Sequence, residues 1–139
     1  MIHLDTNYLI GLAVPGSPEA RRVDEWLGAG ESVAASALAW TEFLNGPVQP
    51  QEITLVESVI ESRIIAFDKV TAVLAAELFN KTGRRRGSRF DCLIAATAIL
   101  SQAEVATVNE SDFKVFVPHG LKLAVAPQPP SQSAPAGSK

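Results

Sequence analysis

Four acidic side chains lie close to the ends of segments that read as β-strands. The predicted strand 2–4 ends at Asp5, and Glu42 lies in the helix that follows a second predicted strand. Asp91 opens the most apolar predicted helix, and Asp112 follows a later strand, with Asn109 beside it. Because parallel strands end at one edge of an α/β sheet, where such sheets bind ligands, we expect the four carboxylates to share one cleft.

A cluster of carboxylates needs a counter-charge. Two carboxylates about 4 Å apart repel by roughly 4 kcal/mol at the dielectric typical of a protein surface. A hard divalent cation with oxygen ligands offsets that repulsion. The chain has two histidines and one cysteine, Cys92, which disfavours zinc and favours Mg²⁺, with Mn²⁺ as the alternative. Such an ion suits phosphodiester hydrolysis, with one metal or two.

Each of these residues also has a purely structural interpretation. Asp5 and Asp91 occupy positions typical of helix N-caps, and Asp112 and Asn109 are common turn residues. Glu42 could be a solvent-exposed residue of its helix, although several of its neighbours are apolar. Taken singly, none of the five identifies a metal site, so the prediction depends on the set.

The basic residues are unevenly distributed. The net charge is −3, yet five of the twelve basic residues fall within positions 81–89, just ahead of Asp91. Such a patch attracts a polyanion locally, although a solvated loop is the structural alternative. We therefore predict that Arg84, Arg85, Arg86 and Arg89 form a loop that binds the phosphates of a polyanion.

Strands and helices alternate along the chain, which predicts an α/β fold: a three-layer α/β/α sandwich with a mostly parallel central sheet. Ser17, Ser36 and Asp68 are expected to cap helices, and a further helix follows Pro50. The predicted strands are 2–4, 33–35, 64–67 and 105–108, with an edge strand at 115–117 and another at 121–125. The basic segment 83–89 is expected to be a loop.

Length and composition predict one domain, 1–125, and a separate tail. Residues 126–139 are rich in Pro and Ser and are expected to be disordered. No apolar run is long enough for a membrane span and no leader pattern is present, so we expect a cytoplasmic protein with no membrane association.

Four motifs, in this order, resemble those of one family. They are LDTN at 4–7, SAL at 36–38 continuing to EFLNG at 42–46, RFDCLIAATA at 89–98, and TVNESDF at 107–113. The chain is similar to PIN domains, and more narrowly to toxin ribonucleases of the VapC type, over residues 1 to about 125. The arginine-rich segment and the tail depart from the family pattern, so the choice of RNA is not carried over.

The resemblance implies a Mg²⁺-dependent endoribonuclease, the toxin of a type II toxin–antitoxin system. Asp5, Glu42 and Asp91 match the three principal acidic ligands of the family, and Asp112 matches a more variable fourth, with Asn109 as its helper or substitute. The polar residues that orient the carboxylates or bound waters are matched by Thr6, Asn7 and Thr107. The resemblance also implies a homodimer and a small VapB-like antitoxin.

Four other interpretations remain, and the last of them is a nuclease that acts on DNA, from which the local sequence does not distinguish an RNA nuclease. The first is a PIN-like RNA- or protein-binding module without catalysis, and the second is a housekeeping nuclease with no antitoxin. The third, an aspartate phosphotransferase, needs a second acid two residues after Asp5, where this chain has Asn7.

Overall fold

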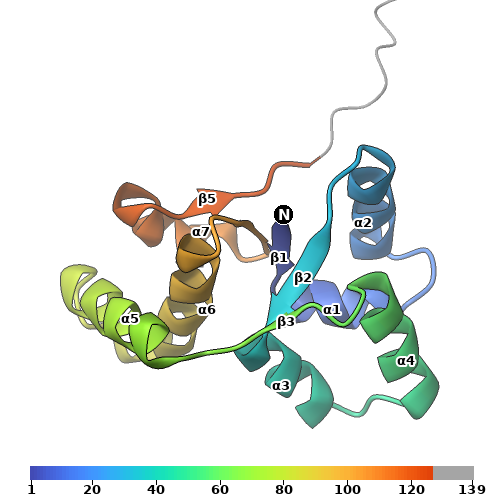
Figure 1. Ribbon diagram of the computed structural model, residues 1–139, viewed down its shortest axis with the longest axis horizontal. Helices are drawn as coiled ribbons and strands as arrows, with labels where there is room; N and C mark the ends of the chain where they lie inside the picture. The colour runs from blue at the N-terminus through green and yellow to red at the C-terminus, as the bar shows by residue number, and fades with distance from the viewer. Residues whose placement is uncertain (127–139) are drawn as a thin grey trace, which may run out of the picture.

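The computed structural model describes residues 1–126 as a parallel β-sheet with helices on both sides (Figure 1). The strand order is β3-β2-β1-β4-β5, and every neighbouring pair is parallel. This confirms the predicted α/β sandwich, whereas the predicted tail lies outside the described residues except for Ala126. The strands are β1 (Ile2–Leu4), β2 (Val33–Ser36), β3 (Ile64–Ile65), β4 (Glu104–Ala106) and β5 (Lys122–Leu123).

Two groups of helices cover the sheet. Figure 1 shows α5 and α6 on one side, and α1, α2 and α4 on the other. Within residues 1–126, no helix combines the length and the apolar content that crossing a membrane requires. The helices are α1 (Thr6–Leu12), α2 (Pro18–Gly28), α3 (Ala37–Asn45), α4 (Pro50–Val59), α5 (Lys69–Lys81), α6 (Arg89–Leu100) and α7 (Glu110–Phe113), with 3₁₀ helices η1 (Arg86–Ser88) and η2 (Lys114–His119).

Local signals explain where most helices begin. Ser17, Ser36 and Asp68 accept hydrogen bonds from the backbone N–H groups three residues ahead, at 2.9 to 3.0 Å. These are the predicted caps of α2, α3 and α5. The central strands β1 and β2 are buried throughout, as expected for strands with helices on both faces. The caps and the buried strands therefore position the helices and strands that carry the acidic residues.

The predicted edge strand 115–117 is wrong, because this segment lies in the 3₁₀ helix η2. Phe113 and Phe116 are fully buried and their ring centroids lie 6.1 Å apart, edge to face. A spacing of three residues places both rings on one face of a helical turn, whereas a strand would direct them to opposite faces. The burial of two aromatic rings therefore decides the conformation.

Smaller differences occur next to the acidic residues. Helix α6 begins at Arg89, so Asp91 is its third residue and not its first, and the predicted loop 83–89 contains η1. The predicted strands 64–67 and 105–108 are two and three residues long. The short β4 leaves Thr107 and the residues after it free to bend over the sheet edge.

The cap of α3 can be tested because this helix carries Glu42. Ser36 is buried, and its hydroxyl accepts from the N–H of Ala39. We expect Ser36→Ala to lower the free energy of unfolding by about 1 kcal/mol, measured by urea denaturation. Ser58→Ala, an exposed position in α4, is the control and should change it by less than about 0.5 kcal/mol. Equal effects of the two changes would contradict the capping role.

Candidate active site

Asp5 lies at the end of β1, between the two strands that pair with β1. Its N–H donates to the carbonyl of Ala106 at 2.9 Å, which continues the pairing with β4. One carboxylate oxygen accepts from the N–H of Thr6 at 2.7 Å, and the other accepts from the hydroxyl of Thr107 at 2.9 Å. Only 6% of Asp5 is exposed. Asp5 therefore caps α1, as the structural interpretation held, and also presents a fixed carboxylate at the sheet edge.

Glu42 approaches Asp5 through a shared threonine. The hydroxyl of Thr6 donates to a Glu42 carboxylate oxygen at 2.7 Å, while its backbone N–H holds Asp5. Glu42 projects from α3 and is exposed. The second turn of α3 thus brings a carboxylate to the end of β1 from 37 positions along the chain.

Asp5, Glu42 and Asp91 line one cavity of about 430 Å³. Asp112 lies outside it and lines an adjoining cavity of about 280 Å³, which shares Asp91. The structure thus brings three of the four acids to one cavity and places the fourth beside it. The other residues lining the larger cavity are Thr6, Asn7, Asn45, Phe90 and Asn109.

Asn45 and Phe90 were not among the residues singled out from the sequence. Asn45 follows Glu42 by three positions in α3, so both lie on one face of the helix, and Phe90 precedes Asp91. The helical spacing from Glu42 was therefore the available signal for Asn45.

Burial and mutual repulsion control the ionisation of these carboxyls. Burial, and then the charges of Asp5, Asp112 and Glu42, raise the pKa of Asp91 to about 6, against a smaller opposing effect of Arg85. Burial also raises the pKa of Asp5, against the hydrogen bonds from Thr6 and Thr107, and Glu42 raises it further. Asp91 is thus electrostatically coupled to all three other acids.

The chemistry of the donor set fits a hard divalent cation. The side chains are carboxylates, amides and hydroxyls, which are the oxygen donors preferred by Mg²⁺. Within residues 1–126, no three Asp, Glu, His or Cys side chains already form a closed metal-binding group. Mg²⁺ is commonly held by only one or two carboxylates and keeps several waters, so a preformed group of three is not required.

The four arginines differ in their surroundings. The guanidinium groups of Arg84 and Arg89 lie over the ring of Phe79, 5.5 and 5.4 Å from its centroid, and Arg84 also bonds the side chain of Asn80. Arg85 lines the cavity of Asp91 and Asp112. Arg86 is exposed at the start of η1. Of this set, only Arg85 lines a cavity that contains the acids.

Comparisons with known proteins place this geometry in context. A family model of the PIN domain matches residues 2–116. Comparison with curated proteins finds no significant match.

Solved structures resemble the chain along most of its length. FitAcB from Neisseria gonorrhoeae has a TM-score of 0.65 and 25% identity, covering 88% of this chain and 96% of that one. FitAB bound to an IR36 DNA fragment has a TM-score of 0.65 and 27% identity, covering 89% and 94%. A toxin–antitoxin complex from Klebsiella pneumoniae has a TM-score of 0.64 and 25% identity, covering 82% and 91%.

The raised pKa of Asp91 predicts a pH-dependent cost to stability in the absence of metal. Because the folded pKa of about 6 exceeds the ordinary value of 3.8, this carboxyl favours the folded state below about pH 4, and the benefit is lost as pH rises through 6. We expect Asp91→Asn to raise the melting temperature in EDTA at pH 7.5, with a smaller gain at pH 4. Calorimetry at both pH values, with Glu77→Gln on α5 as control, checks this. A lower melting temperature at pH 7.5 would contradict it.

Proposed function

Because the chain belongs to the PIN domain family, we propose that it is a metal-dependent endoribonuclease and the toxin of a type II toxin–antitoxin system. The observation that carries the proposal is the cavity lined by Asp5, Glu42 and Asp91 at the carboxyl edge of the sheet. Carboxylates at such an edge, contributed by three separate segments, suit a hard cation and a phosphodiester substrate.

Asp5, Glu42 and Asp91 would hold Mg²⁺, or Mn²⁺ in its place, and Asp112 would contribute from the adjoining cavity. When bound, such an ion polarises a phosphodiester oxygen and offsets the charge of the leaving oxygen. Thr6 and Thr107 fix the carboxylate of Asp5 by donating one hydrogen bond to each of its oxygens.

A further hydrogen bond supports the carboxylate of Asp5 indirectly, through Thr107. The N–H of Asn109 donates to the Thr107 hydroxyl at 3.0 Å, which orients the bond from Thr107 to Asp5. The side chains of Asn7 and Asn109 line the same cavity and supply further polar groups there. Such supporting groups typically change metal affinity or activity by about 10- to 100-fold.

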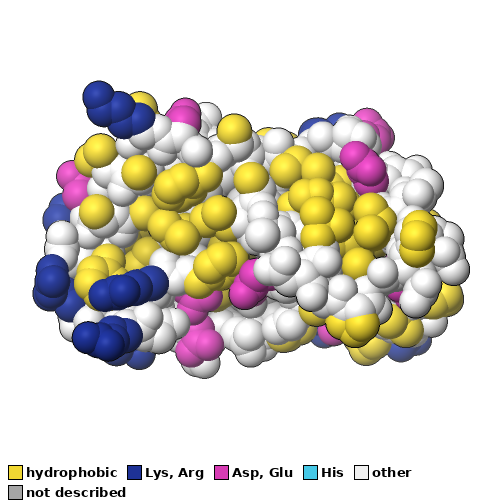
Figure 2. Space-filling model, turned by 90° about the horizontal axis from the view of Figure 1, so that it is seen from below, with side chains coloured by type: hydrophobic (Ala, Val, Ile, Leu, Met, Phe, Trp, Pro, Cys, Tyr) yellow, Lys and Arg dark blue, Asp and Glu magenta, His cyan; other side chains and the backbone are white. Residues whose placement is uncertain are grey.

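The proposed partners are RNA, a small VapB-like antitoxin and a second copy of the chain. Similarity to the Klebsiella pneumoniae toxin–antitoxin complex supports the antitoxin. Figure 2 shows two apolar areas on one face with acidic side chains between them, and two apolar areas suit two protein contacts. Exposed apolar side chains include Ile10 and Val14 near α1, and Val70 and Val73 on α5. The proposed setting is the cytoplasm.

Replacing Asp5 tests the nuclease activity directly. We expect Asp5→Asn to reduce Mg²⁺- or Mn²⁺-dependent cleavage of a structured RNA by more than about 100-fold, beyond the typical effect of losing a supporting group. EDTA should abolish cleavage by the unchanged protein. The matched control is Glu77→Gln, an exposed acid on α5, which should leave the rate unchanged. Cleavage at the normal rate by the Asp5→Asn protein would refute the proposal.

The arginine loop makes a second prediction. Because Arg85 lines the cavity of Asp91 and Asp112, we expect Arg85→Ala to weaken RNA binding and to reduce the salt slope of log K by about 0.7, the value for one phosphate contact on a single strand. Fluorescence anisotropy of a labelled RNA in EDTA, where cleavage stops, measures both. Arg84→Ala is the control, since Arg84 lies over Phe79, and it should change the slope less. Identical slopes for both variants would leave Arg85 without a phosphate contact.

A further inference from the structure

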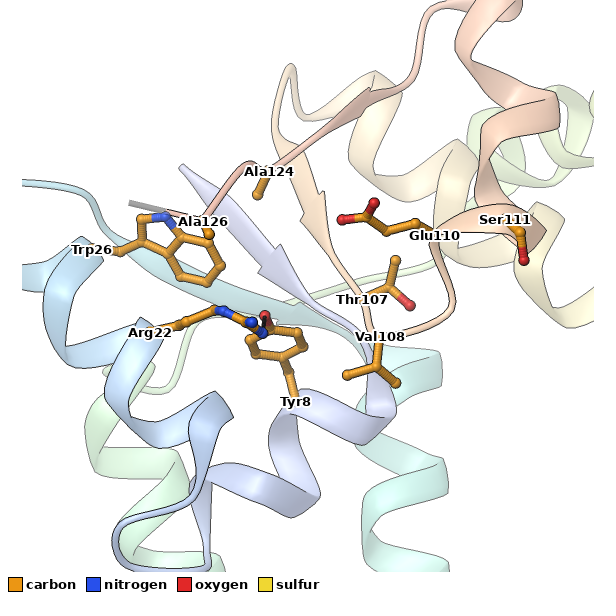
Figure 3. A pocket seen from close by; sticks show the side chains of 9 residues that line it. All are labelled: Tyr8, Arg22, Trp26, Thr107, Val108, Glu110, Ser111, Ala124 and Ala126. Carbon is orange, nitrogen blue, oxygen red and sulfur yellow. Dashed lines mark hydrogen bonds between the residues drawn. The ribbon is translucent and has the colours of Figure 1, made fainter. Parts of the chain in front are cut away.

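A second cavity, of about 520 Å³, adjoins the acid site and has a different character (Figure 3). Its volume is typical of small-molecule sites. Thr107 connects the two, because it lines this cavity and its hydroxyl donates to the carboxylate of Asp5 in the acid site. The lining residues come from α1 and α2, from the segment after β4, and from the chain after β5: Tyr8, Arg22, Trp26, Thr107, Val108, Glu110, Ser111, Ala124 and Ala126.

The segment after β4 separates the two cavities. Thr107 and Glu110 line the second cavity, whereas Asn109 lines the acid cavity. Thr107 and Asn109 are two positions apart, so their Cα atoms are at most about 7 Å from each other, and the two cavities open on either side of a short segment. A strand whose phosphate lies at the acids can therefore place a neighbouring base in the second cavity.

Aromatic rings and an arginine form one wall. The ring centroids of Tyr8 and Trp26 are 5.9 Å apart, and both residues are largely buried. Arg22 donates from one terminal nitrogen to the Tyr8 hydroxyl at 3.0 Å, which orients the guanidinium and leaves further donors for a ligand. The indole N–H of Trp26 donates to the carbonyl of Val125 at 3.1 Å, so its ring is fixed too.

Glu110 supplies the opposite charge across the cavity. Figure 3 shows the Glu110 carboxylate and the Arg22 guanidinium projecting into the cavity from opposite sides. The hydrogen bond and charge of Tyr8 raise the pKa of Arg22 most, against burial, and the charges of Glu19 and then Glu110 add smaller effects. In residues 1–126 these two charges do not form an ion pair within 4.0 Å. A ligand between them would need donors on one side and acceptors on the other.

We propose that this cavity binds a guanine base of the RNA strand, next to the phosphate at the acid site, an inference that rests on the proposed nuclease function. Unpaired RNA bases are recognised by stacking on aromatic or arginine planes and by hydrogen bonds to their edges. Guanine places two donors side by side, N1–H and the N2 amino group, which match the two oxygens of Glu110. Its O6 and N7 accept from arginine. Adenine, cytosine and uracil each present donors from only one nitrogen on that edge.

Tryptophan fluorescence tests base binding without cleavage. The chain has two tryptophans, so a Trp40→Phe variant leaves Trp26 as the only reporter, after its melting temperature is compared with that of the unchanged protein. We expect guanosine monophosphate, titrated in EDTA, to change this emission at about tenfold lower concentration than the adenosine, cytidine or uridine monophosphate. Glu110→Gln in the same background should remove that difference. Glu25→Gln, an exposed acid on α2, should preserve it.

Cleavage patterns supply the second test. With a random-sequence RNA pool, we expect the full chain to cut with guanosine enriched at one fixed position beside the cut, and Glu110→Gln to lose this enrichment. Inosine lacks the N2 amino group, so inosine at that position should slow cleavage by the unchanged protein and leave the Glu110→Gln protein unaffected.

The two tests separate the inference from the proposed function. Glu110-dependent binding of guanosine monophosphate without cleavage under either metal would keep the base site and refute the nuclease. Cleavage with neither base preference nor nucleotide binding would keep the nuclease and overturn the base site. If an antitoxin changes the Trp26 emission and nucleotides do not, the cavity is a protein contact and the inference is overturned.

Discussion

The structure depends on holding one buried carboxylate, Asp5, at the switch point of a parallel sheet. After β1 the chain runs outward to β2 and β3, and later returns to β4 and β5 on the other side. Strand order reverses between β1 and β4, where ligands bind in open α/β sheets, and Asp5 and Thr107 follow these two strands. Burial and the charge of Glu42 raise the pKa of Asp5, whereas the hydrogen bonds from Thr6 and Thr107 stabilise its ionised form and lower the pKa. The fold therefore places two hydrogen-bond donors beside the carboxylate that it buries.

These bonds remove the conflict between the capping and the functional interpretation of Asp5. A carboxylate has two oxygens, and here one caps α1 while the other accepts from the hydroxyl of Thr107, the residue after β4. The cap fixes the carboxylate relative to the backbone, so the structural role assists the functional one. Asp91 differs, because it is the third residue of α6 and the N-cap position is Ser88. The sequence pattern alone treated the two acids as equivalent.

Features with local causes could be predicted from the sequence, and features decided by tertiary contacts could not. The caps at Ser17, Ser36 and Asp68 bond backbone groups three residues away, and all three were predicted. The segment 115–117 has a strand-like composition, but it lies in the 3₁₀ helix η2, where Phe116 packs against Phe113 at the end of α7. The arginines are similar in sequence, yet the ring of Phe79 separates Arg84 and Arg89 from Arg85. Asp112 was expected in the same cleft as the other acids, and the bend after β4 directs it to the adjoining cavity.

The acids also differ in exposure, which bears on how an ion would be held. Asp5 is fixed by two hydrogen bonds and burial, whereas Glu42 and Asp112 are exposed and Asp91 is half-buried. Mutual repulsion favours separation of these charges when no cation balances them, consistent with the lack of a closed group of three among the described residues. A cation bound between Asp5 and the more exposed carboxylates would offset that repulsion. An ion that binds only the folded chain would therefore stabilise it, by about 2.7 kcal/mol at 100 times its dissociation constant.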